Sequence, residues 1–206
     1  MGILCENIAR RANQEDDCTG RFFEARFKCR ECVDEGGVLL CGLYVDLNPI
    51  RAGEAGSPET ACYTSAYQRI QAQQQRKNAR DRADGWLAEL SLRDGSVQDP
   101  RKVYSSRTGR RASDLGVLSI SWENYLKLLR WTGRQMRSGA RSTVPRDLEA
   151  VLDQLLLRAD TWLETVRDCQ QAFCHAVGAP AGLAAVAERM GRRCLKGASA
   201  SRHAFV

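Results

Sequence analysis

The sequence predicts a mainly α-helical protein that ends in a bundle of helices. Apolar residues recur at the spacing of one helix face in several segments, most strongly in the C-terminal third of the chain. No segment shows a strong signal for a strand hairpin. The chain has 206 residues, of which 43% are hydrophobic, so it is long and apolar enough to bury a core.

Two helices are expected near the N-terminus. Residues 3–13 predict a short helix, which the polar residues 14–20 interrupt. A second helix is expected over about 34–48. Asp34 can cap its first turn, and the residue before Pro49 is biased away from helical geometry, so the proline sets the stop.

The middle of the chain predicts one more helix and then a linker. Ser65 can cap a helix that is polar on nearly every side. After it the periodicity fades into turn-forming and small polar residues. We therefore expect three parts: residues 1–84, a partly disordered linker over 85–118, and a helical bundle over 119–206 that is a candidate for DNA binding.

The C-terminal part predicts four helices. Ser121 caps the first, Pro145 opens the second, and Asp160 caps the third, which Gly178 is expected to stop. An alanine-rich helix follows over 180–190. The apolar stripes of the first three helices consist of Trp122, Tyr125, Leu126, Leu129 and Met136; Leu148, Val151, Leu152, Leu155 and Leu156; and Trp162, Val166, Cys169 and Phe173.

The charge of the chain is unevenly distributed. The formal net charge is +6, but residues 101–141 hold ten Lys or Arg against two acids, so this segment alone carries +8. Such an excess favours a polyanionic partner, and nucleic acid is the first candidate. A solvated helix face followed by a basic loop is the alternative explanation.

The nine cysteines favour a reducing compartment. Their number is odd and no secretory signal precedes them, which indicates thiols in the cytoplasm rather than disulfides. Cys29 and Cys32 have the spacing of a metal knuckle, but the only nearby thiol is Cys41 and no histidine pair completes a zinc site. No run of 18 apolar residues exists, so no membrane partner is expected.

Tyr44 lies in the apolar segment "LLCGLYVDLNPIRAG", residues 39–53. On a helix its neighbours include Cys41, Asn48 and Arg51, a surface that mixes apolar, amide and cationic groups. A tyrosine with an ordinary pKa of about 10 needs a cation or a metal beside the reacting group to act as a nucleophile. Spacing alone allows either a half-buried packing residue or a nucleophile.

Several blocks of the sequence resemble a known family. "YVDLNPIRAG" at 44–53, preceded by "GRFFEARFK" and followed by "SPETACYTSAYQRI", resembles the region around the tyrosine of the REP-associated tyrosine transposases, which belong to the HUH superfamily. "WTGRQMRSG" and the closing "KGASASRHAF" resemble the extended bacterial branch of that family. The resemblance covers nearly the whole chain, with its blocks in the family's order.

This resemblance implies cleavage and joining of single-stranded or hairpin DNA through a phosphotyrosine intermediate, with Tyr44 as the nucleophile. It implies that residues 1–84 are the C-terminal part of a catalytic domain, an incomplete α/β remnant. Phosphate contacts near the tyrosine and along the basic segment would come from Arg21, Arg26, Lys28, Arg51, Arg107, Arg110 and Arg111.

The family also uses a Mg or Mn ion, held by a His-hydrophobic-His pair before the tyrosine helix. No histidine precedes Tyr44 in this sequence. We therefore expect a truncated transposase that holds no metal and cleaves no strand by itself.

Two alternatives remain open. The chain could be a non-catalytic DNA-binding protein or regulator derived from a transposase, whose C-terminal helices have lengths compatible with a helix-turn-helix. It could also be a remnant without function, whose apolar helix over 38–47 lies exposed and promotes self-association.

Overall fold

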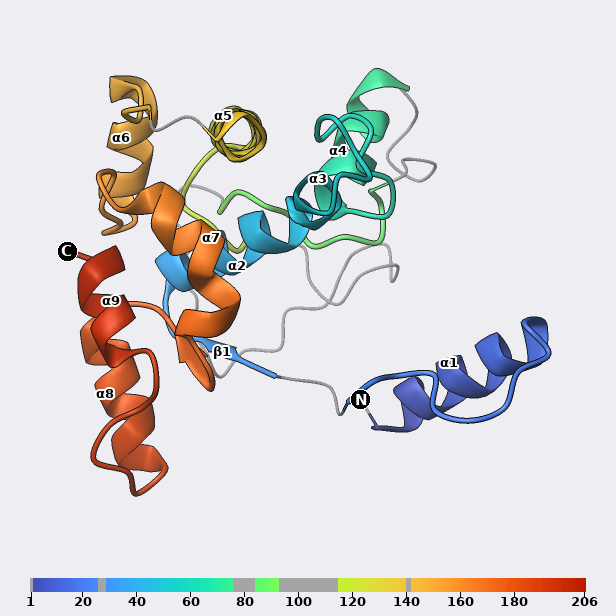
Figure 1. Ribbon diagram of the computed structural model, residues 1–206. Helices are drawn as coiled ribbons and strands as arrows, with labels where there is room; N and C mark the ends of the chain where they lie inside the picture. Colours follow the sequence, from blue (N-terminus) through green and yellow to red (C-terminus); the bar gives the residue numbers. More distant parts are fainter. Residues whose placement is uncertain (1, 26–28, 76–83, 93–114, 140–141) are drawn as a thin grey trace. The chain divides into compact units, whose positions relative to one another are not determined.

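The computed structural model describes residues 2–25, 29–75, 84–92, 115–139 and 142–206. The chain is mainly helical, as predicted, and divides into two compact units, Met1–Arg30 and Glu31–Val206 (Figure 1). The first unit contains the helix α1 (Gly2–Glu15), which has no buried residue. None of the described helices has both the length and the apolar character needed to cross a bilayer.

The second unit contains the remaining elements. They are β1 (Glu31–Cys32), α2 (Glu35–Asp46), α3 (Asn48–Arg51), α4 (Ser65–Gln74), α5 (Trp122–Ser138), α6 (Arg146–Gln154), α7 (Trp162–Ala172), β2 (Ala176–Val177), α8 (Pro180–Arg189) and α9 (Ala198–Ala204).

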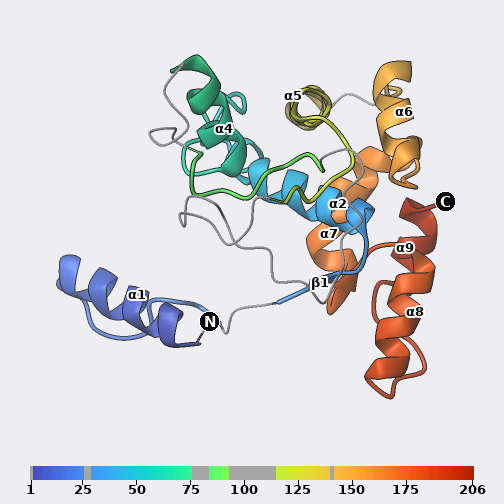
Figure 2. The ribbon, with the colours of Figure 1, turned by 180° about the vertical axis from the view of Figure 1, so that it is seen from behind.

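Helix α2 forms the centre of the core. As predicted, Asp34 caps it, and its carboxylate accepts a hydrogen bond of 2.7 Å from the Gly37 backbone amide. Leu39, Leu40 and Leu43 are fully buried. Helix α2 packs along α7 and also contacts both strands (Figures 1 and 2). The expectation that this apolar helix lies exposed is therefore wrong, because α7 and its neighbours cover the leucines.

Pro49 ends α2 but does not end helical structure. The chain passes through Leu47 directly into α3, where the proline occupies the first turn and needs no amide partner. Ile50 in this short helix is buried, and α3 packs against α5. The tight connection places Arg51 close to Tyr44, two turns earlier along the chain.

A buried carboxylate joins three helices of the second unit. Asp46, at the end of α2, is only 1% exposed. It accepts hydrogen bonds from the Tyr125 hydroxyl of α5 at 2.7 Å and from the Ser65 hydroxyl of α4 at 3.0 Å. The Ala66 amide donates a further bond of 3.3 Å. Burial, followed by the Asp46 charge, raises the pKa of Tyr125 well above 10, so the phenol remains a donor.

A short parallel sheet, which the sequence did not indicate, closes the core. Glu31 aligns with Ala176 and Cys32 with Val177. Gly37 of α2 lies against this sheet, where a Cβ atom would come within 2.3 Å of the Val177 carbonyl oxygen. Only glycine allows this approach of helix to strand.

Three predicted helix boundaries need correction. The cap of α4 is Thr64 rather than Ser65, and the residue before α7 is Thr161 rather than Asp160, whose carboxylate accepts from the Thr161 amide. Helix α7 ends at Ala172, well before Gly178, because the following residues become extended to pair with β1. Helix α9 was not predicted.

The compact units divide the chain at a different place from the three predicted parts. Helices from both the 1–84 and 119–206 segments share one core, since α2 packs against α7, and α3 packs against α5. The two described ends of the predicted linker contact each other, because the Leu92 amide donates a hydrogen bond of 2.6 Å to the Leu118 carbonyl. Residues 93–114 lie outside the described part of the chain.

Candidate nucleic-acid interface

Tyr44 is held in place from two sides. It is partly buried on α2 and packs against the core. Its hydroxyl donates a 2.6 Å hydrogen bond to the side-chain oxygen of Gln170 on α7. The Arg51 guanidinium carbon lies 4.5 Å from the centre of its ring, within range of a cation–π interaction. The ring position is therefore fixed by an amide at the hydroxyl and a cation over one face.

Arg51 also lines a hollow of the surface. Its guanidinium donates to the Arg167 backbone carbonyl at 3.3 Å, which links α3 to α7. Beside it lies a hollow of about 470 Å³. The residues that line this hollow, called the tyrosine-side hollow below, are Ile50, Arg51, Ala52, Gly53, Met136, Arg137 and Arg167.

A second hollow lies between α5 and the segment 56–59. Its volume is about 510 Å³. It is called the loop-side hollow below and is lined by Ile50, Gly56, Ser57, Pro58, Glu59, Arg130, Gly133, Arg134, Arg137 and Ser138. The two hollows adjoin, because Ile50 and Arg137 line both.

The arginines of the loop-side hollow follow the geometry of α5. Arg130, Arg134 and Arg137 are spaced by four and then three residues, so their side chains leave one face of the helix. All three are exposed. Gly133 lies on the packed side of the same helix, where a Cβ atom would come within 3.1 Å of the Leu47 side chain, so α5 approaches α2 and α3 closely.

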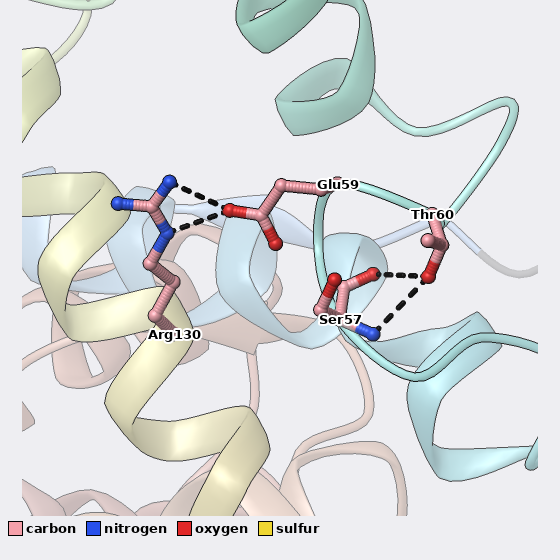
Figure 3. A network of polar contacts seen from close by, with 4 residues as sticks. All are labelled: Ser57, Glu59, Thr60 and Arg130. Atoms are coloured by element: carbon pink, nitrogen blue, oxygen red, sulfur yellow. Dashed lines mark hydrogen bonds and ion pairs between the residues drawn. The ribbon is translucent and has the colours of Figure 1, made fainter.

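A polar network fixes the segment opposite these arginines (Figure 3). The Thr60 hydroxyl accepts from the Ser57 amide at 3.2 Å and donates to the Ser57 carbonyl at 3.1 Å. The Glu59 carboxylate receives the Arg130 guanidinium at 2.6–2.7 Å. The Arg137 guanidinium donates to the Gly56 carbonyl at 2.6 Å.

The Glu59 carboxyl stays ionised to a lower pH than an ordinary glutamate does. Partial burial opposes ionisation, but hydrogen bonds from Ser57 and from its own backbone amide, together with the Arg130 guanidinium, lower its pKa below 4.5. Among the described residues that line the two hollows, Glu59 is the only acid, against five arginines. The joined surface is therefore strongly basic.

The structure brings together only part of the predicted site. Tyr44 and Arg51 are in contact, as the spacing indicated. Arg21 is exposed and belongs to the first compact unit. The other predicted phosphate contacts lie outside the described residues, namely Arg26, Lys28, Arg107, Arg110 and Arg111.

Five residues at or beside this surface were not among the predicted contacts. Arg130, Arg134 and Arg137 carried a signal, because they repeat at helical spacing on a helix that the sequence predicts. Arg167 and Gln170 carried none, since only the packing of α7 on α2 brings them near Tyr44.

The described residues do not fit the metal that the resemblance implies. No group of three or more His, Cys, Asp or Glu side chains within the described ranges could hold an ion. His175 contacts Arg192, and His203 contacts Glu164, so neither belongs to a histidine pair. Contact with the Cys41 side chain, together with burial, raises the pKa of the Cys32 thiol, which disfavours the thiolate that a metal requires.

No disulfide joins any of the nine cysteines, all of which lie in the described ranges.

Comparison with known proteins adds no relative: no family model, no curated protein and no solved structure matches this chain. The resemblance to the tyrosine transposases stays a prediction that rests on the sequence blocks alone.

Proposed function

We propose that this chain binds single-stranded or hairpin DNA as a relative of the REP-associated tyrosine transposases, and that it does so without cutting the strand. The observation that carries the proposal is the joined pair of hollows beside Tyr44. Arginines from α3, α5 and α7 line these hollows, and one of them, Arg51, contacts the Tyr44 ring.

Arginine suits the phosphate backbone of a nucleic acid. Its planar guanidinium donates two parallel hydrogen bonds to phosphate oxygens and remains charged at any physiological pH. Arg51 and Arg167 lie on one side of Arg137, and Arg130 and Arg134 on the other, so a strand that crosses both hollows meets cations along its course. Binding of this kind weakens as salt rises, because the strand regains its counterions.

Tyr44 is positioned rather than activated in this arrangement. Its hydroxyl donates a hydrogen bond to an amide oxygen, and an amide is too weak a base to remove the proton. Arg51 stabilises the ring through its face and can contact a nearby phosphate. The described residues supply no metal site for a leaving oxygen, so no cleavage step follows from this geometry.

A binding and cleavage assay tests the proposal. Fluorescence anisotropy would compare the wild-type chain, Arg51→Gln, Arg167→Gln and the control Arg202→Gln on a labelled hairpin with a single-stranded tail. Arg202 is exposed on α9 and carries the same charge, so it controls for net charge alone. We expect the first two variants to bind about tenfold more weakly, the cost of a charged hydrogen bond, and the control to bind normally.

The same samples, incubated with Mg²⁺ or Mn²⁺ and separated under denaturing conditions, report cleavage. We expect no covalent adduct. An adduct that Tyr44→Phe abolishes would show that Tyr44 is a live nucleophile and would contradict binding without cleavage. Equal affinity of all variants would contradict the DNA-binding surface itself.

A further inference from the structure

The loop-side hollow has features that phosphate-backbone binding alone does not need. Its volume, about 510 Å³, lies within the range of sites that enclose a small molecule. Cations line one wall, and a hydroxyl and backbone groups line the other. A strand crossing an open surface would require only the cations.

The floor of this hollow is apolar. Ile50 is 4% exposed, and Pro58 and Gly133 are buried, yet all three line the hollow. Apolar surface at the base of a basic hollow suits a ligand with a flat or apolar body and a charged end. A nucleoside phosphate has this construction, whereas an inorganic anion has only the charged end.

The wall formed by α5 suits the charged end. Arg134 is exposed on the hollow side of the helix, between Arg130 and Arg137. Arg137 reaches across the hollow to the Gly56 carbonyl, and Arg130 reaches Glu59, so both arginines already span from helix to segment 56–59. A phosphate placed between Arg130 and Arg134 would receive guanidinium groups in the bidentate geometry that arginine favours.

Glu59 occupies the position that such a phosphate would compete for. Its carboxylate receives the Arg130 guanidinium at 2.6–2.7 Å, as a phosphate oxygen would. The side chain is 34% exposed, so it can turn away without unfolding its surroundings. The Glu59 carboxylate therefore forms an ion pair with Arg130 in the absence of a ligand.

We propose that the loop-side hollow between α5 and residues 56–59 binds a nucleoside 5′-phosphate, with the phosphate on Arg130 and Arg134, the nucleoside on Ile50 and Pro58, and Glu59 displaced on binding. This inference rests on the proposed DNA-binding function and gives the surface a specific subsite. The ligand can be a free nucleotide or the 5′-phosphorylated end of a bound strand, since both present the same chemistry.

Isothermal titration of the full chain with dAMP tests the site. Adenosine and inorganic phosphate are the two matched probes, because each supplies one half of the ligand. We expect dAMP to bind at least about tenfold more tightly than either probe, since only dAMP uses both the arginines and the apolar floor. Equal binding of phosphate and dAMP, or no binding of dAMP, would overturn the proposal.

Two variants change the affinity in opposite directions. Arg134→Gln is expected to weaken dAMP about tenfold, since a charged hydrogen bond is lost. Glu59→Gln is expected to tighten dAMP severalfold, because the competing carboxylate is removed; a misfolded variant could not produce that gain. Arg202→Gln, exposed on α9 and outside both hollows, serves as the control and should leave dAMP binding unchanged. Loss of dAMP binding in Glu59→Gln would overturn the competition.

Single-stranded oligonucleotides then identify the source of the ligand. An eight-residue oligodeoxyadenylate with a 5′-phosphate would be compared with the same strand ending in a 5′-hydroxyl. A gain in affinity from the phosphate, lost in Arg134→Gln, assigns the site to strand ends; no gain, with dAMP still bound, assigns it to free nucleotide. Binding of the 5′-hydroxyl strand through Arg51 and Arg167 tests the DNA-binding surface separately, so the two proposals can fail independently.

Discussion

Tyr44 is partly buried, and the two ends of its side chain have different surroundings. Its ring packs against the core, while its hydroxyl reaches the surface and bonds to Gln170. Spacing correctly predicted Arg51 as a neighbour, because α2 continues through Leu47 directly into α3. It could not predict Gln170, which lies 126 residues further along the chain and meets Tyr44 only through tertiary packing.

Removing the Tyr44 hydroxyl should have a small effect on stability. In Tyr44→Phe the ring and its contact with Arg51 remain, and only one exposed hydrogen bond is lost. We expect the free energy of unfolding, measured by urea denaturation, to fall by about 1 kcal/mol or less. A loss several times larger would show that the bond to Gln170 is needed to keep α7 on α2.

Removing the Tyr125 hydroxyl should have a larger effect. Tyr125→Phe would leave Asp46 buried with one hydrogen bond fewer, and a bond to a buried carboxylate contributes about 1.5–3 kcal/mol. Urea denaturation should show a loss of that size. Tyr63→Phe is the matched control, because Tyr63 is 99% exposed, and it should leave the midpoint unchanged. Equal midpoints for both variants would contradict the Asp46 network.

Glu59 should make stability depend on acid pH. The pKa of Glu59 in the folded chain lies below its ordinary value of 4.5. The stabilisation that its ionised carboxylate provides is therefore fully present above pH 4.5 and is lost as the pH falls through the folded pKa. The difference in unfolding free energy between wild type and Glu59→Gln should therefore be positive near neutral pH and shrink below pH 4.5. Because the pair is largely exposed, we expect less than about 1 kcal/mol. A difference that grows in acid would contradict the Arg130 pair.

At the scale of elements, helices with clear caps and apolar stripes could be predicted well. Asp34 and Ser121 cap α2 and α5 as expected, and both side chains accept the predicted amide bonds. The short strands could not be predicted, since two residues are too few for a periodic pattern. Residues 31–32 and 176–177 become strands because they meet each other across the core.

Gly37 tests the contact between α2 and the short sheet. A Cβ atom there would lie 2.3 Å from a backbone carbonyl that cannot turn aside. Gly37→Ala should therefore cost about 1–3 kcal/mol of unfolding free energy in urea, although alanine favours helix over glycine. Gly2→Ala is the control, since nothing lies within 4 Å of its Cβ position, and it should be neutral or slightly stabilising. A stabilised Gly37→Ala would contradict this packing.

At the scale of the whole molecule, the sequence suggested more separation than the structure contains. The faded periodicity between residues 85 and 116 indicated a linker between two parts. Helices from both parts instead build a single core in the unit Glu31–Val206, with α2 against α7. Local periodicity reports which face of a helix is apolar but not which distant helix covers it, and for that reason the arginine surface could be predicted only in part.

The salt dependence of DNA binding shows whether the arginines of the two hollows hold the phosphates of a strand. Affinity for a single-stranded oligonucleotide would be measured by anisotropy from low to physiological salt, for wild type and for Arg51→Gln, Arg134→Gln and Arg167→Gln. We expect log affinity to fall linearly with log salt, and we expect each variant to reduce the slope by about 0.7, the share of one phosphate contact on a single strand. A slope near zero, or slopes unchanged in all three variants, would contradict a DNA-binding surface at these hollows.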